Sequence, residues 1–144
     1  MGTLLLRLAA PIQAWGDESK YDIRGTQNEP TKSGVIGLLA AAMGFRRDSD
    51  QISKLAYSLR LGIRVDQPGR VIRDFHIVRV PKYGKNGIPN DELDGKISIR
   101  HTYTTQRYYL SDACFLVGLE SDDEELLHNV AEALKSPVLD VARY

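Results

Sequence analysis

Strict alternation of apolar and polar positions predicts most of the strands in this chain. The clearest case is the segment 59–65, where apolar residues occupy the odd positions and Arg60, Gly62 and Arg64 occupy the even ones. The second face of that strand is therefore small and basic. The same reasoning predicts strands over 3–8, 71–80 and 113–119, and at best a short last strand over 138–144.

Helical spacing of apolar residues predicts three helices. Two of them cover about 33–43 and 48–58. The third buries the stripe Leu127, Val130, Ala131 and Leu134. Ser121 and Glu124 have the spacing of a capping box in front of this helix, and Ser136-Pro137 ends it.

A polar, glycine-rich stretch between 81 and 94 interrupts the core pattern. With a returning arm over 97–109, it predicts a protruding β-hairpin, a thumb of about 79–106 inserted between core strands two and three. Without this insertion and the short second helix, the order is strand, helix, strand, strand, helix, with the final strand weak or missing. That is the α+β, ferredoxin-like (RRM-like) βαββαβ plan, with one domain over 1–144.

Composition narrows the class of protein. The apolar run 4–10 is too short to span a bilayer and carries Arg7, so we expect neither a membrane nor an export signal. A single cysteine, Cys114, fits a reducing cytoplasm. The three histidines lack ligand spacing, and no Walker or dinucleotide fingerprint is present, so neither a metal nor a cofactor is expected.

Charge is unevenly distributed although the formal net charge is zero. Residues 1–107 hold 17 Lys and Arg against 11 Asp and Glu, whereas residues 108–144 hold 2 against 8. Such asymmetry favours a polyanion such as nucleic acid, or an oppositely charged partner. The simpler interpretation is that the acidic residues decorate a solvated helix, which we adopt for 120–132.

The start of the first helix has the features of an anion site. Thr31 or Ser33 can cap the exposed backbone N–H groups, and Lys32 stands beside the positive helix end. A phosphate of a nucleic-acid backbone suits this arrangement. An ordinary capped core helix explains the same residues, and Trp15 in its Gly-bounded loop is equally open to a packing role.

The predicted thumb combines cations with rings. Arg100, His101 and Arg107 lie on or beside it, with Tyr103, Tyr108 and Tyr109. Guanidinium groups contact phosphates and tyrosine rings stack on unpaired bases, a combination suited to single-stranded RNA. For metal-free ribonuclease chemistry the available side chains are His76, His101, Lys82 and Tyr83, but no spacing pairs them, and a structural role is the simpler interpretation of His76.

Several blocks resemble one family. They are Leu6-Arg7-Leu8-Ala9-Ala10-Pro11-Ile12-Gln13-Ala14-Trp15-Gly16, then Arg24-Gly25-Thr26, Pro30-Thr31-Lys32-Ser33-Gly34, Arg73-Asp74-Phe75-His76 and Arg107-Tyr108-Tyr109-Leu110. In this order they resemble the CRISPR-associated CasD family, the fifth Cas family, of type I-E Cascade complexes. The resemblance spans nearly the whole chain.

The resemblance implies a repeat-associated (RAMP) RNA-binding fold and a non-catalytic subunit that holds the 5′ handle of the crRNA. The Cascade backbone subunits and the large subunit are its implied protein partners. Carried onto this sequence, and with His101 added from the thumb, the candidate RNA-binding residues are Gln13, Trp15, Arg24, Thr31, Lys32, Ser33, Arg100, His101, Arg107 and Tyr108.

One departure keeps other hypotheses open. Members of the family continue into a Tyr-Leu-Gly-Arg-Arg element, whereas this sequence stops at 138–144, so we expect a shortened chain. An unpaired sheet edge would follow, which a partner or a second copy of the chain can cover. The alternatives to a crRNA-binding subunit are a metal-independent endoribonuclease that processes CRISPR repeat RNA, and a truncated remnant that only assembles with proteins.

Overall fold

A three-stranded antiparallel sheet forms the body of the protein. The computed structural model describes residues 1–16, 22–82 and 99–138. Its first sheet has the order β1–β7–β4, with β1 (Gly2–Ala9), β7 (Cys114–Ser121) and β4 (Arg60–Gln67). Every second side chain of β7 is buried, because one face of the sheet is covered and the other is open. The alternation that predicted these strands is confirmed.

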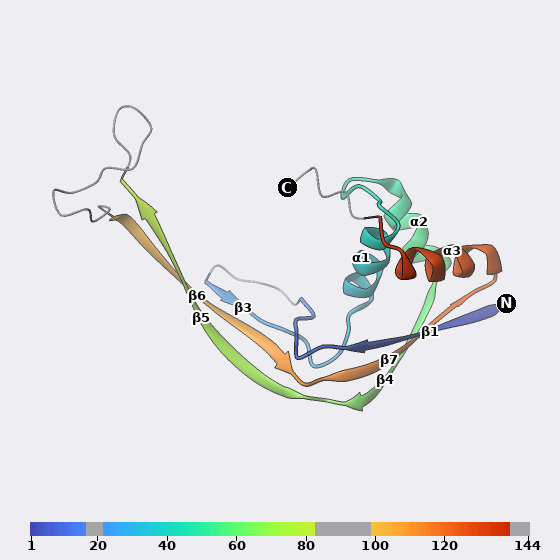
Figure 1. The fold of residues 1–144 in the computed structure, drawn as a ribbon, viewed down its shortest axis with the longest axis horizontal. Helices are drawn as coiled ribbons and strands as arrows, with labels where there is room; N and C mark the ends of the chain where they lie inside the picture. The colour runs from blue at the N-terminus through green and yellow to red at the C-terminus, as the bar shows by residue number, and fades with distance from the viewer. Residues whose placement is uncertain (17–21, 83–98, 139–144) are drawn as a thin grey trace.

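Three helices cover one face of this sheet (Figure 1). They are α1 (Lys32–Ala42), α2 (Asp50–Ser58) and α3 (Glu124–Lys135), close to the predicted bounds. The core between the layers holds fully buried side chains from α1, β7 and α3, namely Val35, Leu39, Val117, Leu119 and Val130. No helix in the described ranges is long and apolar enough to cross a membrane.

A long β-hairpin connects β4 to β7. Its arms are β5 (Arg70–Pro81) and β6 (Ile99–Ser111), paired from Arg70 opposite Ser111 to Pro81 opposite Ile99, with a shift of register between Val80 and Pro81. Figure 1 shows the two arms running away from the helices as one curved ribbon. The paired arms reach beyond the predicted thumb of 79–106 on both sides, and its segment 83–98 lies outside the described residues.

Strand β6 is the centre of a second sheet. On one side it pairs with β5, and on the other with two short strands, β2 (Ile12–Gln13) and β3 (Ile23–Arg24). The β2 pairing is antiparallel and the β3 pairing is parallel. The loop after β1 is therefore tied to the base of the hairpin.

The hairpin exposes large apolar side chains in a row. Val71, Phe75 and Ile77 are 55%, 59% and 47% exposed. Their odd positions put them on one face of β5, because successive strand residues point to opposite faces. We call these three residues the hairpin apolar row. Arg73 lies on the same face between Val71 and Phe75, so Phe75 and Ile77 form the uninterrupted part of the row. Large exposed apolar side chains gathered on one face mark contact surfaces.

The β4–β5 turn packs against the β6–β7 turn. Gly69 has a φ of 71°, a left-handed conformation that favours glycine. A Cβ at this position would overlap the carbonyl oxygen of Ser111 and come within 2.9 Å of the backbone N and Cβ of Ala113. The positive φ and this close approach are two separate reasons for a glycine in the turn.

Of two predictions about the C-terminal part, one is wrong and the other lies mostly outside the described residues. The cap of α3 is Asp123, whose carboxylate accepts from the Leu126 N–H at 2.9 Å. Ser121 instead accepts from the Asp123 N–H at 3.2 Å, so the predicted Ser121–Glu124 capping box is wrong. The predicted last strand lies mostly at 139–144, outside the described residues. Within the described part, β1 is an edge strand of its sheet.

Candidate nucleic-acid interface

The first turn of α1 leaves two backbone amides open. Thr31 is the N-cap in extended conformation, and its Oγ1 accepts from the Gly34 N–H at 3.1 Å. The Ser33 hydroxyl lies 3.3 Å from the same Oγ1. In the described ranges, no acceptor is found for the N–H groups of Lys32 and Ser33. Unpaired donors at a helix start, with an exposed lysine beside them, attract anions.

Trp15 packs against this helix start. A Cβ at Gly34 would lie 3.0 Å from Cε3 of the indole and 3.0 Å from the Thr31 hydroxyl oxygen. The glycine therefore leaves the space that the indole ring occupies. Trp15 is half-buried and also packs on the hydrophobic core, so part of its role is structural.

Hydrogen bonds hold the loop that carries Trp15. The Trp15 N–H donates to the Thr26 hydroxyl at 2.9 Å, and the indole Nε1–H donates to Gln13 Oε1 at 3.2 Å. Gln13 is only 8% exposed, and its Nε2 donates to the carbonyl of Ala113 at 2.7 Å. Both ends of the Gln13 amide are thus used within the protein, and Gln13 acts on the loop by positioning Trp15.

A shallow cavity of about 270 Å³, open to solvent, lies beside Trp15 at the end of β1. It is lined by Arg7, Leu8, Ala9, Ala10, Gln13 and Trp15. Sequence reasoning missed Ala9 and Ala10 as part of a site. The only local signal was a pair of small residues directly after a strand, which is compatible with many structures.

Arg24 and Arg107 are register partners on neighbouring parallel strands, β3 and β6. Arg107 also faces Asp74 across the β5–β6 ladder. The Arg107 Nε is buried and has no hydrogen-bond partner among the described residues, and the same holds for the Thr105 hydroxyl. Two cations side by side repel each other, and a polyanion bound over them would relieve that repulsion.

The remaining thumb candidates lie elsewhere along β6. Tyr108 falls on the opposite face from Arg107, because neighbouring strand residues alternate. His101 is six residues from Arg107, about 20 Å along an extended strand, and its ring packs edge-on to Tyr103 at 4.3 Å between centroids. Arg100 lies at the bulge near the far end of the described ladder. These residues are therefore spread along the hairpin, whereas Gln13, Trp15, Thr31, Lys32 and Ser33 lie around the start of α1.

Arg60 and Arg64, on the open face of the first sheet, are both ion-paired within the chain. Arg60 bonds to Glu120 at 2.8 Å and reaches Asp122 at 3.4 Å. The hydrogen bond to Glu120 has the largest effect, and together these contacts raise the pKa of Arg60. Arg64 bonds to Asp66 at 2.6 Å, which lowers the pKa of Asp66. This face therefore offers less free positive charge than the alternating pattern predicted.

The two histidines considered for ribonuclease chemistry lie apart on the hairpin. His76 is half-buried opposite Thr105, whereas His101 is opposite Val80. Four residues of β6 separate these positions, about 13 Å along the strand. Tyr83 lies outside the described residues. In the described part of the chain, no cluster of three or more His, Cys, Asp or Glu side chains could hold a metal ion.

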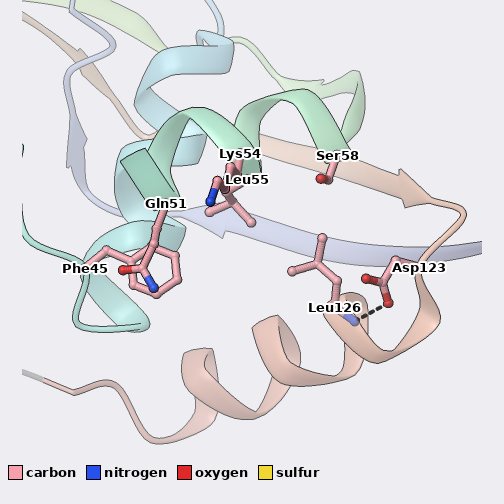
Figure 2. A pocket seen from close by; sticks show the side chains of 7 residues that line it. All are labelled: Phe45, Gln51, Lys54, Leu55, Ser58, Asp123 and Leu126. Atoms are coloured by element: carbon pink, nitrogen blue, oxygen red, sulfur yellow. Dashed lines mark hydrogen bonds between the residues drawn. The ribbon is translucent and has the colours of Figure 1, made fainter. Parts of the chain in front are cut away.

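A second hollow of about 240 Å³ lies between α2 and the start of α3 (Figure 2). Leu55, Phe45 and Leu126 give it apolar walls, and polar side chains form its rim. Figure 2 shows Asp123 occupied in capping the Leu126 N–H. None of the candidate RNA-binding residues lines this hollow.

Comparison with known proteins gives consistent matches. A family model described as CRISPR-associated protein (Cas_Cas5) matches residues 3–142. The CRISPR system Cascade subunit CasD of Escherichia coli (strain K12) is 36% identical over 125 residues, which are 81% of this chain and 52% of that protein.

Two solved structures are similar along most of the chain. One is titled CRISPR RNA-guided surveillance complex, with a TM-score of 0.72, 34% identity, and coverage of 94% of this chain and 54% of the matched chain. The other, titled Crystal structure of Cas protein, has a TM-score of 0.62, 42% identity, and coverage of 94% and 53%. The chain thus spans about half the length of the relatives it matches.

Proposed function

Because the chain belongs to the Cas5 family of CRISPR-associated proteins, we propose that it is a non-catalytic crRNA-binding subunit of a type I-E Cascade surveillance complex. In this role it holds the 5′ handle of the crRNA. The observation that carries the proposal is the start of α1, where the open amides of Lys32 and Ser33 stand beside the Lys32 ammonium group.

Phosphate is the group that this corner suits best. The helix dipole adds a partial positive charge at the same end, and the Ser33 hydroxyl is exposed as a further donor. Phosphate contacts position a nucleic-acid strand without reading its sequence. The corner therefore anchors the backbone of the handle at one point.

The hairpin supplies the second part of the proposed RNA surface. Arg24 and Arg107 form a cationic pair at its base, and His101 and Arg100 lie further out. Tyr108 adds a ring on the other face. Alternating cations and rings along a strand suit an unpaired ribonucleotide segment, in which bases stack and phosphates pair with arginine.

Protein partners are proposed for two other surfaces. The hairpin apolar row leaves Val71, Phe75 and Ile77 in water, and a neighbouring backbone subunit or the large subunit would cover it. The outer edge of β1 is suited to pairing with a partner strand or a second copy of the chain. The fold is proposed to be a single ferredoxin-like domain of the RAMP type, working in the cytoplasm.

The test is equilibrium binding of an RNA with a type I-E CRISPR repeat sequence, measured across a range of salt concentrations. The affinity of the wild-type protein should fall linearly with salt on a double-logarithmic scale, because bound phosphates release counterions. Lys32→Gln should weaken binding and reduce the slope by roughly 0.7, the value for one phosphate contact on a single strand.

Lys54→Gln is the matched control. Lys54 is an exposed lysine on α2, at the rim of the hollow in Figure 2 and away from the start of α1. This variant should leave the slope unchanged. Absence of binding, or an affinity that does not depend on salt, would refute the proposal. The same RNA should also stay intact during incubation with chelator, since specific cleavage would favour the endoribonuclease hypothesis.

A further inference from the structure

We propose that the cavity beside Trp15 holds one unstacked nucleobase of the bound RNA. This inference rests on the proposed function and deepens it, because the start of α1 contacts only phosphate. A base in the cavity would give the same site a point of contact that depends on the base itself.

The size and lining of the cavity suit a planar ring. Its volume of about 270 Å³ lies just below the range of small-molecule pockets. The methyl side chains of Ala9 and Ala10 leave room, while Trp15 supplies an aromatic surface. Arg7, an exposed residue of β1, also lines the cavity.

The indole is fixed before any ligand binds. Its N–H donates to Gln13, whose own amide donates to the Ala113 carbonyl. Its six-membered ring is held against Gly34 on α1. A rigid ring loses little conformational freedom when a base stacks on it, so more of the stacking energy appears as affinity.

The cavity adjoins the proposed phosphate site. Gly34 touches the Trp15 ring and directly follows Lys32 and Ser33, which carry the open amides. A single nucleotide can therefore place its phosphate at the helix start and its base beside Trp15. The cavity also lies on an edge strand, so main-chain N–H and C=O groups near Leu8 and Ala9 are available to the base edge.

The first experiment leaves the protein unchanged. A series of repeat-derived RNAs, each with one abasic nucleotide, is titrated against the wild-type protein. An abasic nucleotide at one position should lower the affinity by about 5- to 100-fold, the range for one stacked base, and abasic nucleotides elsewhere should lower it much less. Trp15 is the only tryptophan in the chain, so its fluorescence reports on this cavity alone. Intact RNA should quench it, and the RNA abasic at the sensitive position should not.

Substitutions then locate the effect. In the Trp15→Leu variant, an abasic nucleotide at the sensitive position should lower the affinity no more than one at any other position, because the stacking surface is gone. Trp15→Phe keeps a ring and should retain most of the penalty. Tyr57→Leu is the aromatic control, since Tyr57 is 91% exposed on α2, and it should behave as wild type.

The outcomes separate this inference from the proposed function. If the intact RNA binds, but all the abasic RNAs bind with equal affinity and Trp15 fluorescence does not change, the base cavity is refuted and the phosphate site is not. An abasic penalty that persists in Trp15→Leu refutes it as well, because the base is then read elsewhere. Failure of the intact RNA to bind refutes both proposals.

Discussion

Gly69→Ala tests how the hairpin is fixed to the body of the protein. Gly69 sits in the β4–β5 turn with a φ of 71°. An alanine there adopts a left-handed conformation at a cost of about 1–2 kcal/mol. Its Cβ would also meet backbone: it overlaps the Ser111 carbonyl oxygen and approaches the Ala113 N to 2.9 Å. Backbone cannot move aside as a flexible side chain does.

The expected loss of stability follows from these two effects. Overpacking of a close contact adds about 1–3 kcal/mol, so the free energy of unfolding should fall by about 2–5 kcal/mol in total. That is a large part of the stability of a typical domain, about 5–15 kcal/mol. Urea unfolding followed by far-ultraviolet circular dichroism measures this loss, provided that the m-value stays constant.

Gly37→Ala is the matched control. Gly37 lies in α1 with nothing within 4 Å of an added Cβ, and its conformation is helical. The variant should gain up to about 1 kcal/mol from helix propensity. If Gly69→Ala unfolds within about 0.5 kcal/mol of wild type, the turn is not packed as described, and the position of the hairpin has another cause.

Three further predictions concern the core, a helix cap and an ion pair. Phe115→Ala removes a fully buried ring and should cost about 3–5 kcal/mol of unfolding free energy in the same urea assay. Asp123→Ala removes the cap on the Leu126 N–H and should cost about 1 kcal/mol, seen as a lower Tm. The pKa of Asp66 is lowered chiefly by its hydrogen bond with Arg64, so nuclear magnetic resonance titration of Arg64→Gln should show that pKa rising toward its ordinary value. Because the pKa is lowered, the pair stabilises the fold at pH values above the unfolded pKa of Asp66. This stabilisation is small, since the pair is exposed to solvent, and it is lost as the pH falls through the folded pKa. An unchanged Asp66 titration in Arg64→Gln would contradict the pairing.

Local signals in the sequence were sufficient for most single elements. The alternation from Leu59 to Val65 and the capped apolar run after Thr31 each specify their element without reference to distant residues. The family resemblance carried by the Trp15 and Lys32 blocks is confirmed by the comparisons, and these blocks are the part of the site that the structure gathers around α1.

Features that depend on distant residues were not predictable in this way. The hairpin and its returning arm were predicted, but not that its paired arms extend back to Arg70 and Ser111. The cap of α3 was misassigned because Ser121 and Asp123 both have capping side chains, and the choice between them depends on where β7 ends. The ion pairs of Arg60 and Arg64 required the sheet register, since alternation shows a basic face but not its acidic neighbours.

The central claim is that open backbone amides at the start of α1 bind an RNA phosphate, and amide chemical shifts test it most directly. In the ¹⁵N-labelled protein, the N–H resonances of Lys32 and Ser33 should shift as repeat-derived RNA is added and reach a plateau with binding. The Gln51 amide, which starts α2 and already donates to Ser49 at 3.2 Å, should stay in place. If the RNA binds while the Lys32 and Ser33 resonances do not move, the account is contradicted.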